Sequence, residues 1–211
     1  MSRTRLSAPS KRGPATGSAP RKAAVQARSA RTVEAIIEGA ARILETLGFE
    51  GYTTNAIAKR AGVSIGSLYQ YFPNKAAITL ALIAREGAIL AGDLRQADRI
   101  EDGREALERM IEAAVGHQLR RPVLARLLDI EEGRLAVDGD PVVAADLRGR
   151  LQSALERASF ESPVASETAA LDLIGMARGI TDMARYQPGL KAVDLRARLR
   201  RAVFGYLAFA D

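Results

Sequence analysis

The chain has 211 residues, a net charge of +6 and no cysteine, which excludes disulfides and thiolate metal sites. Its single histidine, His117, excludes a zinc site built from histidine and cysteine, and also the two-histidine HExxH motif. No apolar run approaches the roughly 20 residues of a membrane span, and no apolar segment follows the basic N-terminus as it would in a signal peptide. We therefore expect a cytoplasmic protein that has no membrane segment, cofactor or metal.

The first 28 residues form a basic segment rich in Ser, Pro, Gly and Ala. They carry seven basic side chains and no acidic one, so residues 29–211 sum to −1. Because the segment has almost no large apolar groups to bury, residues 1–28 are predicted to be a disordered basic tail. The tail is either a solvated leader or an arm that adds nonspecific affinity for phosphates.

From residue 29 onward, hydrophobic residues recur at helical spacing. A first helix is predicted around Ile37 and Leu44, with Gly48 as its C-cap. Two short helices follow, and a long helix is predicted over 75–97. Later helices are expected around 107–114, from Pro122, from Pro141, after Ser166 and from Asp194. Since no stretch shows sustained period-two alternation, the predicted fold class is all-α.

Residues 53–75 read TTNAIAKRAGVSIGSLYQYFPNK, which predicts two short helices joined by a tight turn at Gly62. The apolar side chains in this run are explained by packing between the helices, but the exposed positions of the second helix are not. Ser67 and Gln70 are suited to base edges, and Tyr69 can donate to a phosphate oxygen. This pattern indicates a helix that enters the DNA major groove.

The run T-x-x-I-A-x-x-A-G-V-S-x-G-x-L-Y-x-Y-F-x-x-K extends from Thr54 to Lys75, and it resembles the signature of TetR/AcrR repressors at every position. The resemblance implies a three-helix DNA-binding domain with a helix-turn-helix over 29–75. It also implies a larger helical effector-binding and dimerisation domain over 76–211. The implied DNA-binding residues are Thr54, Asn55, Ser64, Ile65, Gly66, Ser67, Tyr69, Gln70, Tyr71 and Lys75. Of these, Ser64 has a competing role as a helix cap, and Ile65 either touches a thymine methyl or simply lies on the surface.

The same resemblance implies a homodimeric repressor that a small-molecule effector releases from its operator. The alternatives are an activator or a ligand-independent DNA-binding regulator and, with less support, a helical protein-interaction module or an enzyme. The chain shows no nucleophile–base–orienter set, which argues against an enzyme.

Three further features have alternative interpretations. His117 continues an apolar helical stripe, so it either lines an effector pocket or is a hydrogen-bonded histidine near a helix end, and we favour the second. Glu131 and Glu132 are adjacent, so they point in different directions and are expected at the surface. The helices over 167–185 and 195–206 are apolar around much of their circumference, so each must bury two sides, and the resemblance implies that they form a four-helix dimer interface. The alternative for these helices is burial within one subunit.

Overall fold

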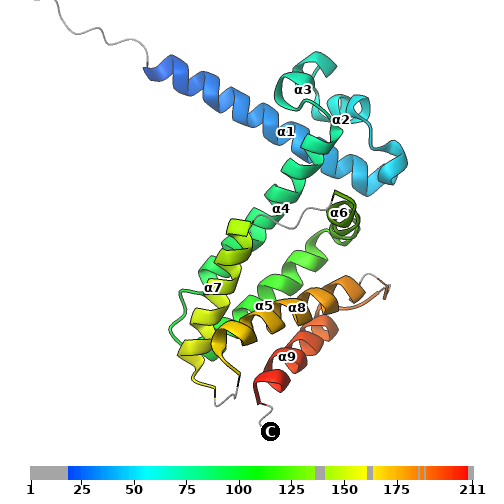
Figure 1. Ribbon diagram of the computed structural model, residues 1–211. Helices are drawn as coiled ribbons and strands as arrows, with labels where there is room; N and C mark the ends of the chain where they lie inside the picture. The colour runs from blue at the N-terminus through cyan, green and yellow to red at the C-terminus, as the bar shows by residue number, and fades with distance from the viewer. Residues whose placement is uncertain (1–18, 136–140, 161–163, 185, 188, 209–211) are drawn as a thin grey trace, which may run out of the picture.

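The computed structural model of the protein describes residues 19–135, 141–160, 164–184, 186–187 and 189–208. In these ranges the chain forms nine α-helices and no strand, so the all-α prediction is confirmed. The helices are α1 (Ala19–Gly51), α2 (Thr54–Ala61), α3 (Ile65–Tyr71), α4 (Lys75–Ala97), α5 (Gly103–Arg120), α6 (Pro122–Leu135), α7 (Pro141–Ala158), α8 (Ser166–Ala184) and α9 (Ala192–Ala208). Figure 1 shows α1 to α3 at one end of an elongated molecule and α5, α7, α8 and α9 at the other.

The helix α1 begins earlier than the sequence predicts. Residues 19–28, which were expected to be disordered, are helical, and the side chains of residues 23–27 are exposed. Alanine, arginine and glutamine have high helix propensity, so residues 23–28 are helical although their side chains are exposed. The prediction of disorder is therefore wrong for residues 19–28, while residues 1–18 lie outside the described residues. Figure 1 shows this part of α1 projecting from the rest of the molecule.

The N-terminal unit is built around one apolar core. Ile36 and Leu44 of α1, Ile57 of α2 and Leu68 of α3 are completely buried in it. Three helices too short or too amphipathic to be stable alone thus share one apolar interior. This core holds α3 in a fixed orientation on the outside of the unit.

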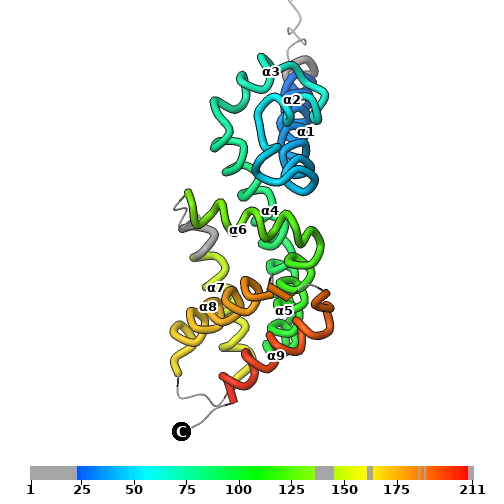
Figure 2. The backbone as a smooth tube through the Cα atoms, turned by 90° about the vertical axis from the view of Figure 1, so that its right-hand side faces the viewer, coloured from blue at the N-terminus to red at the C-terminus, as the bar shows by residue number. Residues whose placement is uncertain are grey.

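The long helix α4 contributes to two separate cores. Ile78 and Leu82, near its start, pack into the N-terminal core. Leu94 and Ala97, near its end, pack into a second core formed with α5, α7, α8 and α9. Figure 2 shows α4 running from one unit into the other. The helix α4 is therefore a continuous physical link between the two units.

The helix α6 also belongs to the N-terminal core, although its residues fall within the predicted second domain. Leu124, Leu127 and Leu128 are buried against the side chains of the first unit. The packing therefore crosses the boundary that the sequence placed at residue 75. No helix in the described part of the chain is long and apolar enough to cross a membrane.

Candidate nucleic-acid interface

Local hydrogen bonds build the turn between α2 and α3. Thr53 Oγ1 accepts from the N–H of Ala56 at 3.2 Å, which caps α2. Ser64 Oγ accepts from the N–H of Ser67 at 3.0 Å, which caps α3. Between the caps, Gly62 has φ +70° and ψ +29°, the left-handed conformation that a Cβ atom disfavours. These interactions fix the angle at which α3 leaves α2.

One face of α3 is buried and the opposite face is exposed. Leu68 is completely buried on the inner side. On the outer side Ile65 is 39% exposed and Tyr69 is 50% exposed, and Gly66 and Gln70 are also exposed. Exposed isoleucine and tyrosine side chains on a seven-residue helix are not explained by packing within the chain.

Tyr69 is held in place by the start of α2. Its phenol oxygen lies 3.2 Å from Thr54 Oγ1, and the two hydroxyls share a hydrogen bond. Thr54 is half-buried, whereas Asn55 beside it is exposed. A phenol fixed in this way is preorganised to donate to or accept from a further group on its open side.

Lys75 stands at the first position of α4, next to the end of α3. Its ammonium group lies 5.5 Å from the ring centroid of Tyr52, within range of a cation–π interaction. Tyr52 is itself buried and its hydroxyl shares a hydrogen bond with Thr79 Oγ1 at 3.1 Å. Asn74 Oδ1 caps α4 by accepting from the N–H of Ala77 at 2.8 Å. The lysine charge is therefore exposed at a fixed place beside α3.

The ten residues predicted to contact DNA surround α3 but differ in exposure. Asn55, Ser64, Ile65, Gly66, Tyr69, Gln70 and Lys75 are exposed, whereas Thr54, Ser67 and Tyr71 are half-buried. Ser67 Oγ accepts a hydrogen bond from Ser64 Oγ at 3.0 Å, and Tyr71 packs partly against the N-terminal core. Ser64 acts as the cap that the sequence allowed for it.

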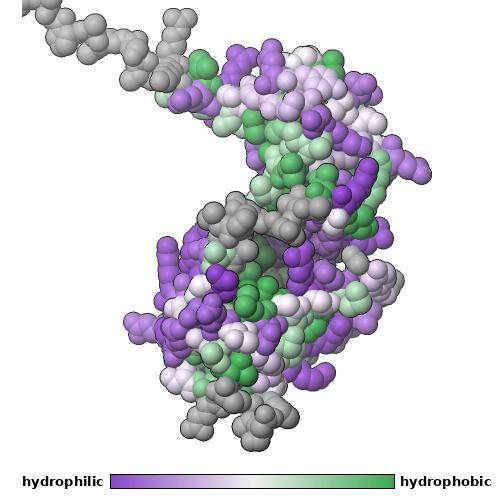
Figure 3. All heavy atoms as spheres, viewed as in Figure 1, coloured by the Kyte–Doolittle hydropathy of each residue, from purple (hydrophilic) through white to green (hydrophobic). Residues whose placement is uncertain are grey.

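The stretch of chain that carries α2, α3 and the start of α4 has charge of one sign. The sequence from Gly51 to Arg85 contains no aspartate or glutamate, and its lysines and arginines include Lys59, Arg60 and Lys75, all exposed. Figure 3 shows hydrophilic side chains over much of this end of the molecule. A surface with exposed cations and no carboxylate attracts phosphate groups.

A second feature, a cavity of about 630 Å³, lies among α4 to α9. Most of its lining is aliphatic. The polar and charged lining residues are Glu86, His117, Gln118, Arg121, Asp129, Glu132, Arg178, Thr181 and Asp182. Within the described residues, no group of three or more His, Asp or Glu side chains is placed to hold a metal ion. The size and mixed lining suit a small organic molecule.

His117 is among the residues that line this cavity, the position that one of its two interpretations from the sequence described. Its Nδ1 atom is buried and has no hydrogen-bond partner. Burial lowers the pKa of His117, and the charge of Arg120 lowers it further. The imidazole is therefore neutral near pH 7.

The expectation that Glu131 and Glu132 lie on the surface is wrong. Glu131 is only 7% exposed and accepts a hydrogen bond from Arg134. Glu132 is half-buried, lines the cavity and lies 3.5 Å from Arg178. Burial raises the pKa of Glu132 above its ordinary value, the charge of Arg178 partly offsets this rise, and the charge of Asp182 adds to it. The two glutamates point in different directions and have different partners, and neither side chain is fully exposed to solvent.

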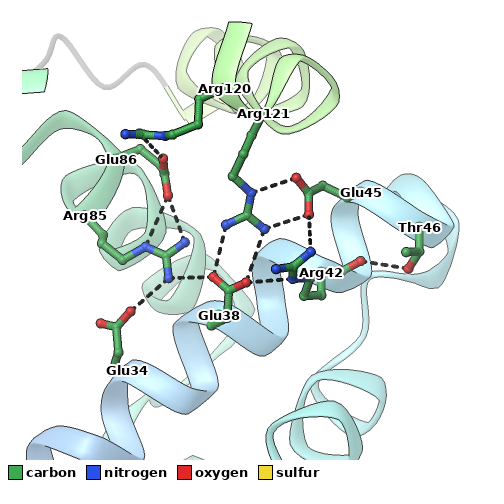
Figure 4. Close-up of polar contacts among 9 residues, drawn as sticks. All are labelled: Glu34, Glu38, Arg42, Glu45, Thr46, Arg85, Glu86, Arg120 and Arg121. Carbon is green, nitrogen blue, oxygen red and sulfur yellow. Dashed lines mark hydrogen bonds and ion pairs between the residues drawn. The ribbon is translucent and has the colours of Figure 1, made fainter. Parts of the chain in front are cut away.

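Beside the cavity, an ion-pair cluster joins α1, α4 and the α5–α6 junction (Figure 4). Its members are Glu34, Glu38, Arg42, Glu45, Arg85, Glu86, Arg120 and Arg121. Four carboxylates face four guanidinium groups, so the cluster is electrically balanced. Two members, Glu86 and Arg121, also line the cavity.

Arg121 makes the strongest contacts in this cluster. Its Nε and Nη2 atoms donate to the two carboxylate oxygens of Glu45 at 2.7 and 2.6 Å, and Nη1 donates to Glu38 at 3.0 Å. Hydrogen bonds to Glu45 raise the pKa of Arg121 above its ordinary value, so the guanidinium stays charged. Since Glu38 and Glu45 are on α1, a residue of the cavity wall is bonded directly to the N-terminal unit.

No residue of the ion-pair cluster was identified from the sequence. Arg121 is separated from Glu45 and Glu38 by 76 and 83 positions, and no local pattern specifies such pairs. The one usable signal was the run of acidic residues at three- and four-residue spacing on α1, which equally describes a solvated helix face.

Comparison with known proteins gives consistent matches. A sequence profile described as "Bacterial regulatory proteins, tetR family" matches residues 36–82. A nucleoid occlusion factor SlmA of Glaesserella parasuis is 31% identical over 81 residues, which is 38% of this chain and 40% of that protein. The transcriptional repressor KstR of Rhodococcus jostii is 29% identical over 139 residues, 64% of this chain and 61% of that protein. The matches thus span less than two thirds of either relative.

Solved structures resemble the greater part of the chain. SmeT, the repressor of a multidrug efflux pump of Stenotrophomonas maltophilia, superposes with a TM-score of 0.66, covering 84% of this chain and 91% of that one. The sequence identity is 21%, so this similarity concerns the fold.

Proposed function

Because the chain belongs to the TetR family of bacterial regulatory proteins, we propose that it is a transcriptional regulator that reads operator DNA with α3. The observation that carries this proposal is the exposed outer face of α3. Ile65, Tyr69 and Gln70 stand free of the core there, and Lys75 lies beside them. In this role Gln70 and Ser67 contact base edges, while Tyr69, Lys75 and the start of α2 contact phosphates.

We further propose that the active form is a homodimer formed through α8 and α9. Leu171, Gly175, Gly179 and Met183 follow one another at four-residue steps, so they share one face of α8. All four are exposed, and a Cβ atom at either glycine would meet nothing within 4 Å. An apolar face with two small residues allows another helix to approach closely. A dimer also places two copies of α3 in successive major grooves, about 34 Å apart.

The cavity supports a repressor that a small molecule releases from DNA. A ligand among α4 to α9 would favour a subunit shape in which the two copies of α3 no longer match the grooves, provided that it binds that shape better. Two connections reach the N-terminal unit from the cavity wall: α4, which belongs to both cores, and Arg121, which is bonded to α1. The relatives KstR and SmeT are described as repressors, which agrees with this direction of control.

The first test is selection of bound fragments from genomic DNA by the full chain, followed by a salt series on the selected site. Lys75→Ala should weaken binding to all sequences and reduce the slope of log affinity against log salt by about 1 for each phosphate that the lysine neutralises. As a control, Arg109→Ala removes an equal charge from an exposed position on α5. We expect the control to leave the slope unchanged.

The outcome also separates the alternatives. Binding that shows no sequence preference near 150 mM salt, roughly the physiological level, would contradict the operator-reading role. Selective binding that no small molecule alters would instead favour a ligand-independent regulator.

A further inference from the structure

The charges around the cavity fall into two groups. Glu86 and Arg121 belong to the balanced ion-pair cluster, where Glu86 is bonded to Arg85 and Arg120, and Arg121 to α1. Their charges are compensated by neighbours that do not line the cavity. Glu86 and Arg121 therefore have little net electrostatic effect on a molecule bound in the cavity.

The second group lies where α6 and α8 meet the cavity. Outside the cluster, the lining contains the carboxylates of Glu132 and Asp182 and one guanidinium group, that of Arg178, besides Asp129, which has an interaction of its own. The Arg178 side chain is 67% exposed, whereas that of Glu132 is 30% exposed, so the cation is directed more towards solvent than the carboxylate it pairs with. Arg178 is one cation beside two carboxylates, Glu132 and Asp182, so this ion pair offsets only part of their negative charge.

Among the described residues of the lining, no other supplies positive charge. His117 is neutral near pH 7 because burial lowers its pKa, and its buried Nδ1 atom still lacks a hydrogen-bond partner. The remaining lining is almost entirely aliphatic and includes Leu107, Met110 and Leu173. No phenylalanine, tyrosine or tryptophan stands among these described lining residues, so the carboxylates are the groups placed to recognise a cation.

From Glu132 and Asp182 in an otherwise apolar cavity, we infer that the ligand is a lipophilic organic cation. Its apolar body would displace water from the aliphatic walls, and its positive charge would lie near α6 and α8. A buried carboxylate is stabilised by a nearby cation, while a carboxylate or phosphate on the ligand would add like charge in a region of low dielectric. This inference rests on the proposed role of the cavity as an effector site.

The test compares two ions of nearly equal shape and opposite charge, tetraphenylphosphonium and tetraphenylborate, by calorimetry on the full-length protein. A single charge near an uncompensated carboxylate, at an effective dielectric constant of about 20, changes affinity by roughly tenfold or more. We therefore expect the phosphonium ion to bind at one site per subunit, at least about tenfold more tightly than the borate. The stoichiometry distinguishes the cavity from the basic N-terminal segment, which would attract the borate.

The variant Glu132→Gln/Asp182→Asn should reduce the ratio of the two affinities at least about fivefold. The control Glu101→Gln/Glu167→Gln removes two exposed carboxylates that do not line the cavity, and it should leave the ratio unchanged. The comparison on the unaltered protein remains decisive if the first variant folds poorly. Borate binding that equals or exceeds phosphonium binding, or no binding of either ion, overturns the inference.

Failure of the inference and failure of the proposed function give different results. The phosphonium ion could bind with the expected preference and yet leave the affinity for the selected DNA unchanged. That result would support the inferred ligand class and contradict the proposal that a ligand in the cavity releases the protein from DNA. If the protein selects no DNA, the calorimetric comparison still reports on the cavity.

Discussion

Arg121 and Arg42 bind the same two carboxylates, Glu38 and Glu45, and they differ mainly in burial. The side chain of Arg121 is 19% exposed and that of Arg42 is 54% exposed. A partly buried guanidinium with bidentate contacts is worth more than an exposed one, because removing it leaves carboxylates with little water to replace it. The pair thus offers a test of the ion-pair cluster with its own internal control.

We expect Arg121→Ala to lower the free energy of unfolding by about 2 kcal/mol. Arg42→Ala should change it by no more than about 0.5 kcal/mol. Urea unfolding followed by circular dichroism measures both. Equal effects of the two substitutions would mean that burial does not set the strength of this cluster.

The same contacts make stability depend on pH. Hydrogen bonds from Arg121 lower the pKa of Glu45, and although burial alone would raise the pKa of Glu38, its bonds to Arg121 bring it below the ordinary value. A carboxylate with a depressed folded-state pKa stabilises the protein fully above its unfolded pKa of about 4.3, and that contribution disappears as the pH falls further. Between about pH 5 and 3, stability should therefore fall more steeply in the unaltered protein than in Arg121→Ala.

At the scale of elements, the packing of α5 against α7 depends on one small residue. Gly103, the first residue of α5, is buried, and a Cβ atom there would lie 2.2 Å from the backbone N of Ala158 and 2.3 Å from the carbonyl O of Ala154. Both contacts are with backbone, which cannot move aside as a side chain can. The two helices can approach this closely only without a Cβ atom at residue 103.

Gly103→Ala should therefore destabilise the protein by about 1–3 kcal/mol. On the same helix, Gly116 is exposed and its Cβ atom would meet nothing within 4 Å. Gly116→Ala should stabilise the protein by about 0.5–1 kcal/mol, because alanine is the better helix former. Thermal unfolding of the two variants gives shifts of opposite sign if this account holds, whereas a stable Gly103→Ala protein would contradict it.

The sequence predicted elements well where their signals are local. The long helix over 75–97 and the cap Ser64 are found as predicted, since each depends on a few neighbouring residues. Leu47 follows Leu44 at a spacing of three residues, which would place it on the same helix face, but it is 56% exposed because the chain changes direction at Gly48, where φ is +61°. The place of α6 in the N-terminal core, the cavity and the ion-pair cluster were not predictable, since they depend on contacts between distant parts of the chain.

At the scale of the whole molecule, the exposed face of α8 bears on the proposed dimer. Leu171 is 50% exposed and Met183 is 48% exposed, so neither contributes much to the core of its own subunit. Leu171→Asp should raise the dimer dissociation constant at least about tenfold and leave the fold of the subunit intact. Sedimentation velocity over a concentration series measures this.

The control for the dimer is Val123→Asp, which places the same charge at a position of α6 that is 44% exposed. It should leave the dissociation constant unchanged. If Leu171→Asp behaves like this control, the dimer, if one forms, uses another face.

The packing of α6 against α1 and α4 has a consequence for exchanging parts between regulators. A chimera that transfers only residues 29–75 to another regulator would lack Leu124, Leu127 and Leu128. These side chains are buried in the same apolar core as those of the transferred helices. The recipient would have to supply apolar groups of similar shape at the matching place. The unit of exchange is therefore a discontinuous one: the helix-turn-helix, the first half of α4 and the buried face of α6.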